Sequence, residues 1–257
     1  MTTVQEVELA IHAWHAAIDT FCSLQPQGQT ATAPHGTRTI TSGTPVPILN
    51  GVISATREPD VAELHALATA YRDEGRPWSI QLRGDTRYRA IDQVASERGL
   101  NRTFTLPFMT KRLGSSDLGV PTIELASVRQ VYAEDHELYN AALAAGYEAP
   151  EHVFRGFSSP AVLSARGMSA FVVEEMGVPV ATSFGAFVNG QVGVFNISTR
   201  PLSRRRGYAR LATAAVLRDA YLKGARTAFL HCTATGRPLY ESLGFEAAEE
   251  WLVYAAG

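Results

Sequence analysis

A short arginine-rich segment is the part of the sequence whose residue types and spacing best suit chemistry. TRPLSRRRGYAR, residues 199–210, holds five arginines in twelve positions of a 257-residue chain whose formal net charge is -2. This concentration of charge suits either a nucleic-acid contact or a site for one compact phosphorylated ligand. Gly207 interrupts the segment, and glycine permits backbone angles and a close ligand approach that other residues do not.

The elements expected on either side favour the phosphorylated ligand. Residues 193–199 (GVFNIST) have a strand pattern, and Pro201 ends the strand because it has no amide hydrogen to donate. Small apolar residues then recur at helical spacing from Gly207 to about Lys223, which predicts a helix packed on a sheet. A helix N-terminus offers unpaired amide hydrogens and the positive end of the helix dipole. One pyrophosphate would account for the whole composition.

Other interpretations of the arginines are less well supported. The Gly-Lys-Ser/Thr of a P-loop and the three-glycine dinucleotide fingerprint are both absent from this segment. The alternative without a binding role is that the arginines are a run of solvent-exposed charge. The glycine between a strand and a helix makes this alternative less favoured. A dedicated nucleic-acid binder usually has a basic surface overall, which a net charge of -2 does not provide.

The rest of the chain predicts an alternation of helices and strands in two similar halves. Residues 26–36 read as a loop and residues 113–122 (LGSSDLGVPT) as a linker. Both halves end in a helix, a Gly-Leu or Gly-Phe pair and a strand, which predicts two copies of one unit, although chance alternation stays open. The expected helices are 4–24, 60–74, 86–99, 127–145, 150–157, 207–223 and 234–242, and the expected strands are 37–43, 46–54, 77–84, 102–113, 169–176, 178–188, 191–199, 226–232 and 245–254.

Two motifs resemble one known family. TRPLSRRRGYARLATAAVL is similar to the pyrophosphate loop of the GNAT superfamily of N-acyltransferases, whose signature is Arg/Gln-x-x-Gly-x-Gly/Ala, here Arg204, Gly207 and Ala209. LHCTATGRPLYESLGF is similar to the strand and helix of that family that end in LGF. The resemblance covers residues 125–257 and extends to 1–112 only by topology, since ISATREPDVAELH has one arginine and no glycine where the loop would lie.

The resemblance implies a tandem GNAT protein with a degenerate N-terminal copy. The fold class expected is α/β (α+β), with two GNAT-like units that are each a mixed, mostly antiparallel sheet flanked by helices. The expected domains are 1–112 without a cofactor loop, the linker 113–122, and a catalytic domain at 123–257. The activity implied is transfer of an acetyl group from acetyl-CoA to a primary amine, by direct attack on the thioester, and a non-catalytic CoA or nucleotide sensor is the alternative.

The same resemblance assigns the cofactor residues. Main-chain groups of the strand would bind the pantetheine arm, an amide near Ile197 would polarise the thioester carbonyl, and amides and guanidinium groups of the loop would hold the pyrophosphate. The residues are Ile197, Ser198, Thr199, Arg204, Arg205, Arg206, Gly207, Tyr208, Ala209, Arg210 and Leu211.

Candidate catalytic residues are fewer. Tyr240 stands where relatives carry a tyrosine that protonates the departing thiolate, and ring packing is its alternative role. The strand before the loop has no carboxylate base, so a water held by Asn196 and Ser183, expected to face each other across the Asn189-Gly190 hairpin, is the proposed relay. Glu151 and His152 are weaker candidates for the acceptor site, with surface solvation as their alternative.

Several expectations concern absences. His231 reads as an interior histidine and Cys232 as a small buried residue, and no spacing suggests a metal ligand set. Two cysteines, an acidic N-terminal helix and no long apolar run suggest a cytoplasmic protein without a signal peptide or membrane span. A small-molecule amine is the expected partner, with no nucleic acid and no membrane, and the oligomeric state stays open.

Overall fold

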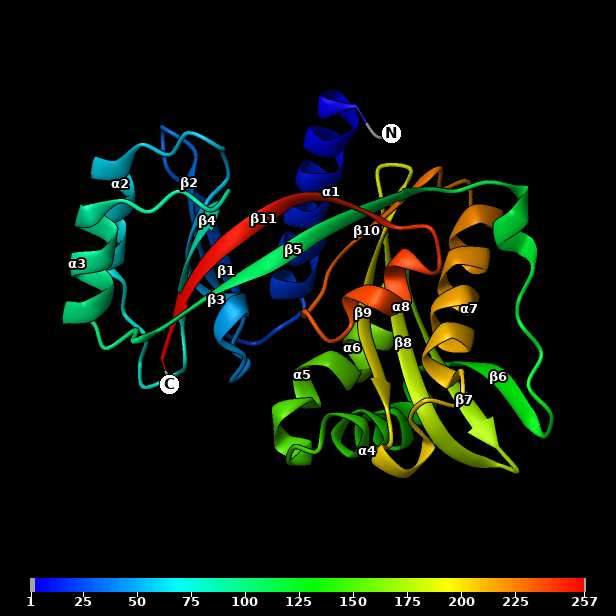
Figure 1. Cartoon of the computed structure of the whole chain (residues 1–257). Coiled ribbons are helices and arrows are strands. Elements are labelled where there is room, and N and C mark those ends of the chain that lie inside the picture. The colour runs from blue at the N-terminus through cyan, green and yellow to red at the C-terminus, as the bar shows by residue number, and fades with distance from the viewer. Residues whose placement is uncertain (1–2, 257) are drawn as a thin grey trace. The chain divides into compact units, whose positions relative to one another are not determined.

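A computed structural model describes residues 3–256 and forms two compact units (Figure 1). The C-terminal unit contains residues up to 17, 110–230 and 236–246, and the N-terminal unit contains 18–109, 231–235 and the residues from 247 onward. Each unit therefore includes one end of the chain from the opposite half. Helix α1 (Val4–Ser23) begins in the C-terminal unit, and most of the last strand, β11 (Glu246–Ala255), belongs to the N-terminal unit.

The N-terminal unit is a mixed sheet covered by two helices. Strands β3 and β4 run parallel, whereas β1 with β2, β2 with β3 and β4 with β11 are antiparallel. A buried apolar cluster joins α2 and α3 to β3, β4 and β11. The elements are β1 (Gln29–Thr32), β2 (Thr37–Thr41), the 3₁₀ helix η1 (Pro47–Leu49), β3 (Asn50–Ser54), α2 (Val61–Ala70), β4 (Ser79–Arg83), α3 (Arg89–Glu97) and β5 (Arg102–Arg112), whose last three residues belong to the C-terminal unit.

In the C-terminal unit, β6 to β9 pair antiparallel and β10 is parallel to β9. The strands are β6 (Ala126–Val131), β7 (Met168–Glu175), β8 (Val178–Val188), β9 (Gln191–Thr199) and β10 (Thr227–His231). The helices are η2 (Ser115–Leu118), η3 (Ala133–Asp135), α4 (His136–Tyr147), η4 (Glu151–Val153), α5 (Arg155–Ser158), α6 (Pro160–Leu163), η5 (Pro201–Ser203), α7 (Tyr208–Leu222) and α8 (Arg237–Glu241).

Helices α4 and α7 cover opposite faces of β8 and β9. The Ser183 hydroxyl of β8 donates to the carbonyl of Ala212 in α7. On the other face, Gly146 of α4 lies so close to β9 that a Cβ on it would fall 2.1 Å from the Ser198 hydroxyl. The predicted fold class, a mixed and mostly antiparallel sheet flanked by helices, is confirmed.

Several expected elements differ from the structure, among them the strand expected over 46–54, which begins as the 3₁₀ helix η1, and the helix expected over 150–157, which is divided into η4 and α5. The helix predicted over 127–145 is a strand, β6, followed by α4, because β7 supplies an antiparallel partner for residues 126–131 that local periodicity does not reveal. The helix predicted to end at Glu74 ends at Ala70. The loop predicted at 26–36 contains β1, which pairs with β2.

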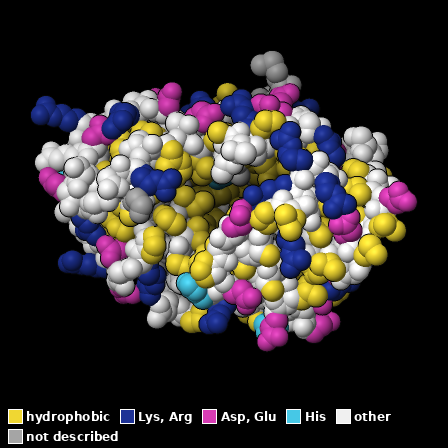
Figure 2. All heavy atoms as spheres, turned by 60° about the horizontal axis from the view of Figure 1, so that its bottom comes forward, with side chains coloured by type: hydrophobic (Ala, Val, Ile, Leu, Met, Phe, Trp, Pro, Cys, Tyr) yellow, Lys and Arg dark blue, Asp and Glu magenta, His cyan; other side chains and the backbone are white. Residues whose placement is uncertain are grey.

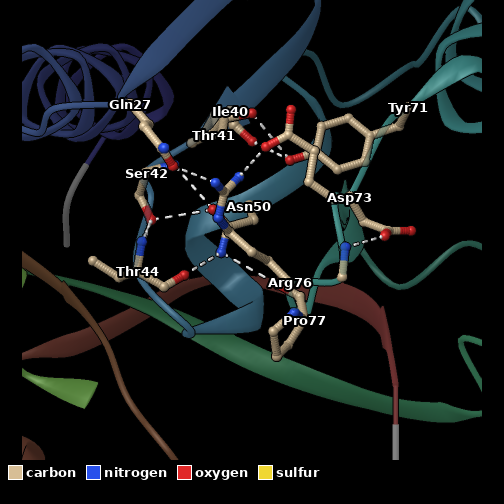
Figure 3. A network of polar contacts seen from close by, with 12 residues as sticks. Gln27, Ile40, Thr41, Ser42, Thr44, Asn50, Tyr71, Asp73, Arg76 and Pro77 are labelled. Carbon is tan, nitrogen blue, oxygen red and sulfur yellow. Dashed lines mark hydrogen bonds and ion pairs between the residues drawn. The ribbon is translucent and has the colours of Figure 1, made fainter. Parts of the chain in front are cut away.

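A buried polar network ties the turn before β3 to its neighbours in the N-terminal unit (Figure 3). The Asn50 side-chain amide donates to the carbonyls of Thr44 at 2.8 Å, Val46 at 3.0 Å and Pro77 at 3.2 Å. Its carbonyl oxygen accepts from the Ser42 amide at 2.9 Å. Asn50 is 2% exposed, so these groups depend on one another rather than on water.

Asn50→Ala is expected to lower the free energy of unfolding of the N-terminal unit by about 2–4 kcal/mol, because it removes these bonds and leaves buried carbonyls unpaired. Urea unfolding measures the change. Thr69→Ala, which deletes an exposed hydroxyl bonded to the His65 carbonyl, is the matched control and is expected to change it by less than about 0.5 kcal/mol. Equal effects of the two substitutions would contradict the prediction.

Candidate active site

Strand β9 has an open edge over its last residues. Within the described residues, its pairing with β10 covers Gln191–Gly193, so the β10-facing edge of Phe195–Thr199 carries main-chain groups that the β10 ladder does not use. On the other edge, the β8–β9 register shifts by one residue between Thr182 and Phe184. Asn196 has a φ of 52° at this bulge. A bulge bends its strand and leaves one residue out of the ladder, which suits an extended ligand laid beside β9.

The Asn189-Gly190 hairpin that sets this register has the predicted form, with φ values of 50° and 74°. The bulge changes the pairing beyond the hairpin, because Asn196 and Ile197 both lie opposite Ser183. The Thr182 hydroxyl donates to the Asn196 carbonyl at 2.8 Å. Asn196 is half-buried.

The turn after β9 presents a run of main-chain amides. Within residues 3–256, the amides of residues 205–210 have no hydrogen-bond acceptor, and the helix has no side-chain N-cap. Gly207 is the N-cap residue with a φ of 89°, and Arg205 has a φ of 64°. Alternation of left-handed and right-handed residues turns successive amides toward one side and forms an anion-binding concavity. The predicted pyrophosphate position therefore has suitable donors.

The structure corrects the prediction that the Leu211 amide binds the pyrophosphate. Its amide donates to the Gly207 carbonyl at 3.0 Å and so forms the first bond of α7. The Tyr208 ring is also fully buried, in a cluster with Val180 and Ala212. Only the main chain of Tyr208 can therefore meet a ligand.

Most of the arginine side chains in the segment bind the protein itself. Arg204 donates to the carbonyls of Thr199 and Gly146 at 3.1 Å each. It also pairs with Glu148 at 2.6 Å, so it ties β9 to the end of α4.

The next arginines differ from one another. Arg206 pairs with Glu175 and lies over the Tyr208 ring at 5.1 Å. The neighbouring Tyr208 hydroxyl and the Arg206 guanidinium lower the pKa of Glu175. Arg210 donates to the carbonyl of Ser242 at 3.3 Å. Among the described residues, the exposed guanidinium groups of Arg200 and Arg205 have no hydrogen-bond or ion-pair partner.

Tyr240 lies on the short helix α8, and the LGF sequence after it forms a Schellman motif. The Phe245 amide donates to the Tyr240 carbonyl, and the Gly244 amide donates to the Glu241 carbonyl, both at 3.0 Å. Gly244 has a φ of 86°, which explains the glycine. The rings of Tyr240 and Phe245 are 5.9 Å apart and nearly perpendicular, and Tyr240 is 9% exposed. The motif thus fixes the tyrosine ring.

The predicted substrate residues are not all supported. Ser183 is fully buried and its hydroxyl donates to the Ala212 carbonyl on the α7 face, so it does not offer this hydroxyl to the predicted relay water or to a substrate. Asn196 is accordingly without its predicted hydroxyl partner. Its side chain instead interacts with the buried hydroxyl of Tyr139, which donates to the Ser183 carbonyl at 3.1 Å.

The remaining candidates lie on the short helices after α4. Glu151 and His152 are both exposed on η4. Beside them, Tyr147 of α4 stacks on Phe154 at 5.2 Å and is 46% exposed. These residues form an aromatic and acidic surface.

The interior residues His231 and Cys232 are placed as expected. The His231 ring packs at 4.5 Å from Trp251 and 5.0 Å from Phe108. Burial lowers the pKa of His231 to about 4, which makes it a poor base at neutral pH. Cys232 is buried beside Met109. Residues 3–256 contain no group of His, Cys, Asp and Glu side chains that could hold a metal ion, and no helix among them is long and apolar enough to cross a membrane.

Sequence reasoning missed the residues that brace the site. Gly146, Glu148 and Glu175 position the arginines. Lys111 and Asp117 form a largely buried ion pair. The sequence places Lys111 at the end of an expected strand and Asp117 in an expected linker. A lysine and an aspartate six residues apart carry no local signal of such a pair.

Comparison with known proteins agrees with this geometry. The sequence model of the acetyltransferase (GNAT) family matches residues 126–245. No curated protein sequence matches the chain. A GCN5-related N-acetyltransferase from Kribbella flavida has a similar structure, with 22% identity over 97% of this chain and 95% of that chain and a TM-score of 0.69.

Two further structures share the fold. A GNAT-family protein from Novosphingobium aromaticivorans has 17% identity over 96% of this chain and 97% of that chain, with a TM-score of 0.60. A conserved protein from Staphylococcus epidermidis has 10% identity over 94% of this chain and 98% of that chain, with a TM-score of 0.65. Residues 126–245 thus form a domain of the GNAT acetyltransferase family, and the protein is an N-acetyltransferase. GNAT enzymes use acetyl-CoA.

Proposed function

We propose that the C-terminal unit transfers an acetyl group from acetyl-CoA to a primary amine of a small molecule. The observation that carries the proposal is the run of unpaired amides at 205–210, directly after a strand whose edge is open over 195–199. Acetyl-CoA fits this arrangement, because its diphosphate needs clustered donors and its pantetheine arm carries amides that can pair with a strand edge.

The proposed chemistry uses few side chains. The amine nitrogen attacks the thioester carbonyl carbon, and a main-chain amide near Ile197 stabilises the oxygen as it gains charge. The carbon–sulfur bond then breaks, and the Tyr240 hydroxyl gives its proton to the thiolate. The proton lost by the amine passes to water, for which Asn196 at the bulge is the proposed contact, and the Tyr240 phenolate takes a proton back from water.

We further propose that the N-terminal half is a degenerate copy of the same unit. In support, Leu100 and Gly99 donate to the carbonyls of Ala95 and Ser96, which repeats the bonding at the end of α8. Ala95 then stands where Tyr240 stands, so no phenol is available. The N-terminus of α2 is capped by the Asp60 carboxylate, which accepts from the Glu63 amide at 2.8 Å. A carboxylate there disfavours a phosphate.

A CoA or nucleotide sensor without chemistry is the alternative, and turnover of acetyl-CoA by the parent protein with an amine decides between the two.

The nucleic-acid interpretation has less support. On the face shown in Figure 2, Lys and Arg side chains are interspersed with Asp and Glu rather than gathered in one field. Three of the five segment arginines are also bound to protein groups.

Two free, buried cysteines support a reducing, cytoplasmic setting.

The acceptor is proposed to be a small cationic amine, because the surface beside α4 combines the exposed Tyr147 ring with the exposed Glu151. The direct test is a screen of amines with acetyl-CoA that follows release of free thiol, together with calorimetry of acetyl-CoA binding. Binding without an acceptor in a broad screen would favour the sensor. Absence of any binding heat would contradict both.

Arg205→Gln is expected to weaken acetyl-CoA binding by about three- to tenfold, because its guanidinium is free to reach a phosphate. Arg218→Gln is the control, since Arg218 is exposed on α7 beyond its first turn, and its affinity is expected to stay within twofold. Calorimetry at two salt concentrations measures both. Affinity lost equally in the two variants would indicate a diffuse charge effect instead.

A further inference from the structure

The helix that carries Tyr240 is too short to hold its own position. Helix α8 has five residues, Arg237–Glu241, and an isolated helix of this length is unstable in water. Its last carbonyls need partners from elsewhere if they are not to lie unpaired. The Schellman bonds from Phe245 and Gly244 satisfy the carbonyls of Tyr240 and Glu241. The next two carbonyls, of Ser242 and Leu243, remain.

Two cations from distant parts of the sequence bind these two carbonyls. Arg210, in the first turn of α7, donates to the Ser242 carbonyl at 3.3 Å and to the Ser242 hydroxyl at 2.6 Å. The Lys111 ammonium group donates to the Leu243 carbonyl. Positive charge at a helix C-terminus is also favoured by the helix dipole. Every carbonyl of the last turn therefore has a donor.

Lys111 is itself held in place. Its ammonium group pairs with the Asp117 carboxylate at 2.7 Å, and the two side chains are 14% and 7% exposed. The second oxygen of Asp117 accepts from the Gly114 amide at 2.9 Å. The side chain of Lys111 also passes the αL glycine of the LGF sequence, where a Cβ on Gly244 would lie 3.4 Å from Nζ. The lysine is thus fixed between η2 and the end of α8.

We propose that Lys111 and Arg210 are positioning residues that hold α8, and with it the Tyr240 hydroxyl, at the reacting thioester. This inference rests on the acid role proposed for Tyr240. Arg210 joins α8 to the same helix turn whose amides are assigned to the pyrophosphate, so the ligand site and the acid are braced against each other. Lys111 comes from the end of β5, which makes the first half of the chain a contributor to catalysis.

The test combines hydrogen exchange with a double-mutant cycle. The variants are Arg210→Gln, which keeps the main-chain amide, and Lys111→Met/Asp117→Asn, which leaves no unpaired buried charge. Each is made alone and with Tyr240→Phe. Lys223→Met, which removes a half-exposed lysine paired with Asp219 four residues earlier in α7, is the matched control. The readouts are amide exchange at Gly244 and Phe245, acetyl-CoA affinity, and kcat with an amine from the screen.

Both positioning variants are expected to speed exchange at Gly244 and Phe245 by at least about tenfold. They are expected to lower kcat by about five- to fiftyfold, with acetyl-CoA affinity within twofold of the parent. In the Tyr240→Phe background they are expected to lower kcat no further. The conservative variant Lys111→Arg is expected to keep most of the kcat of the parent protein, because it keeps a cationic donor at this position.

The outcomes separate this inference from the proposed function. Unchanged exchange at Gly244 and Phe245 overturns the holding of α8, whatever the activity. Faster exchange with rate losses that add to those of Tyr240→Phe overturns the link to Tyr240. If Tyr240→Phe alone leaves kcat unchanged, the acid role fails, and the positioning of an acid fails with it, while the exchange data still report which residues hold α8.

Discussion

Tyr240→Phe is expected to lower kcat by about 10²- to 10⁴-fold, because general acid catalysis commonly contributes a factor of this size. Acetyl-CoA affinity is expected to stay within twofold, since the substitution deletes one oxygen and keeps the ring. That ring packs against Phe245, and the bonds that close the end of α8 are main-chain bonds. Steady-state kinetics with a screened amine and calorimetry of acetyl-CoA binding measure the two quantities.

The control for Tyr240→Phe is Tyr132→Phe, which deletes the same oxygen from a tyrosine that is 51% exposed. It is expected to change neither quantity. Equal and small effects of the two substitutions would show that Tyr240 only packs. If acetyl-CoA binds but neither the parent nor any variant turns over with any amine, the sensor interpretation is favoured.

The arginine loop was readable from the sequence because its structure is local. A strand, a proline, a glycine with positive φ and a helix succeed one another within about fifteen residues, and each has a recognisable signal. Gly207 behaves as predicted. The fate of the side chains was not readable, because Arg204 and Arg206 pair with Glu148 and Glu175, which are distant in sequence.

Errors in the prediction arose where pairing is non-local. Residues 126–131 form a strand because β7 lies beside them, and no periodicity within the segment requires it. The expected face-to-face pairing of Asn196 and Ser183 came from the hairpin register alone. The bulge places Ile197 as well as Asn196 opposite Ser183, and the Ser183 hydroxyl donates to α7 instead of facing Asn196.

The division of the chain into two units also depends on non-local pairing that the sequence does not predict. The sequence suggested two halves in order along the chain, and the proposal of a degenerate first copy still rests on that likeness. In the structure, most of β11 belongs to the N-terminal unit, where it pairs with β4 from Trp251 to Ala255. The sequence of a long strand rich in apolar residues does not specify which strand it will pair with. A buried carboxylate on β11 allows its pairing with β4 to be tested by mutation.

Glu249→Ala is expected to destabilise the N-terminal unit by about 3–5 kcal/mol, because it removes the carboxylate that neutralises the buried Arg83. The Glu249 carboxylate accepts from Arg83 at 2.9 and 3.0 Å, and both side chains are 2% exposed. It also accepts from Arg57 at 3.1 Å and from the indole of Trp251. Arg83 lies on β4, so the network joins β4 to the last strand of the chain.

Urea unfolding measures the effect, with Glu97→Ala, on the exposed side of α3, as the control expected to cost less than about 0.5 kcal/mol. The double variant Arg83→Met/Glu249→Leu is expected to recover much of the loss, since replacing a buried pair by apolar side chains is commonly neutral. A cost below about 1 kcal/mol for Glu249→Ala would mean that the carboxylate is open to water. The pairing of β11 with β4 would then not depend on this ion pair, because removing the carboxylate partner of a buried guanidinium is expected to be costly.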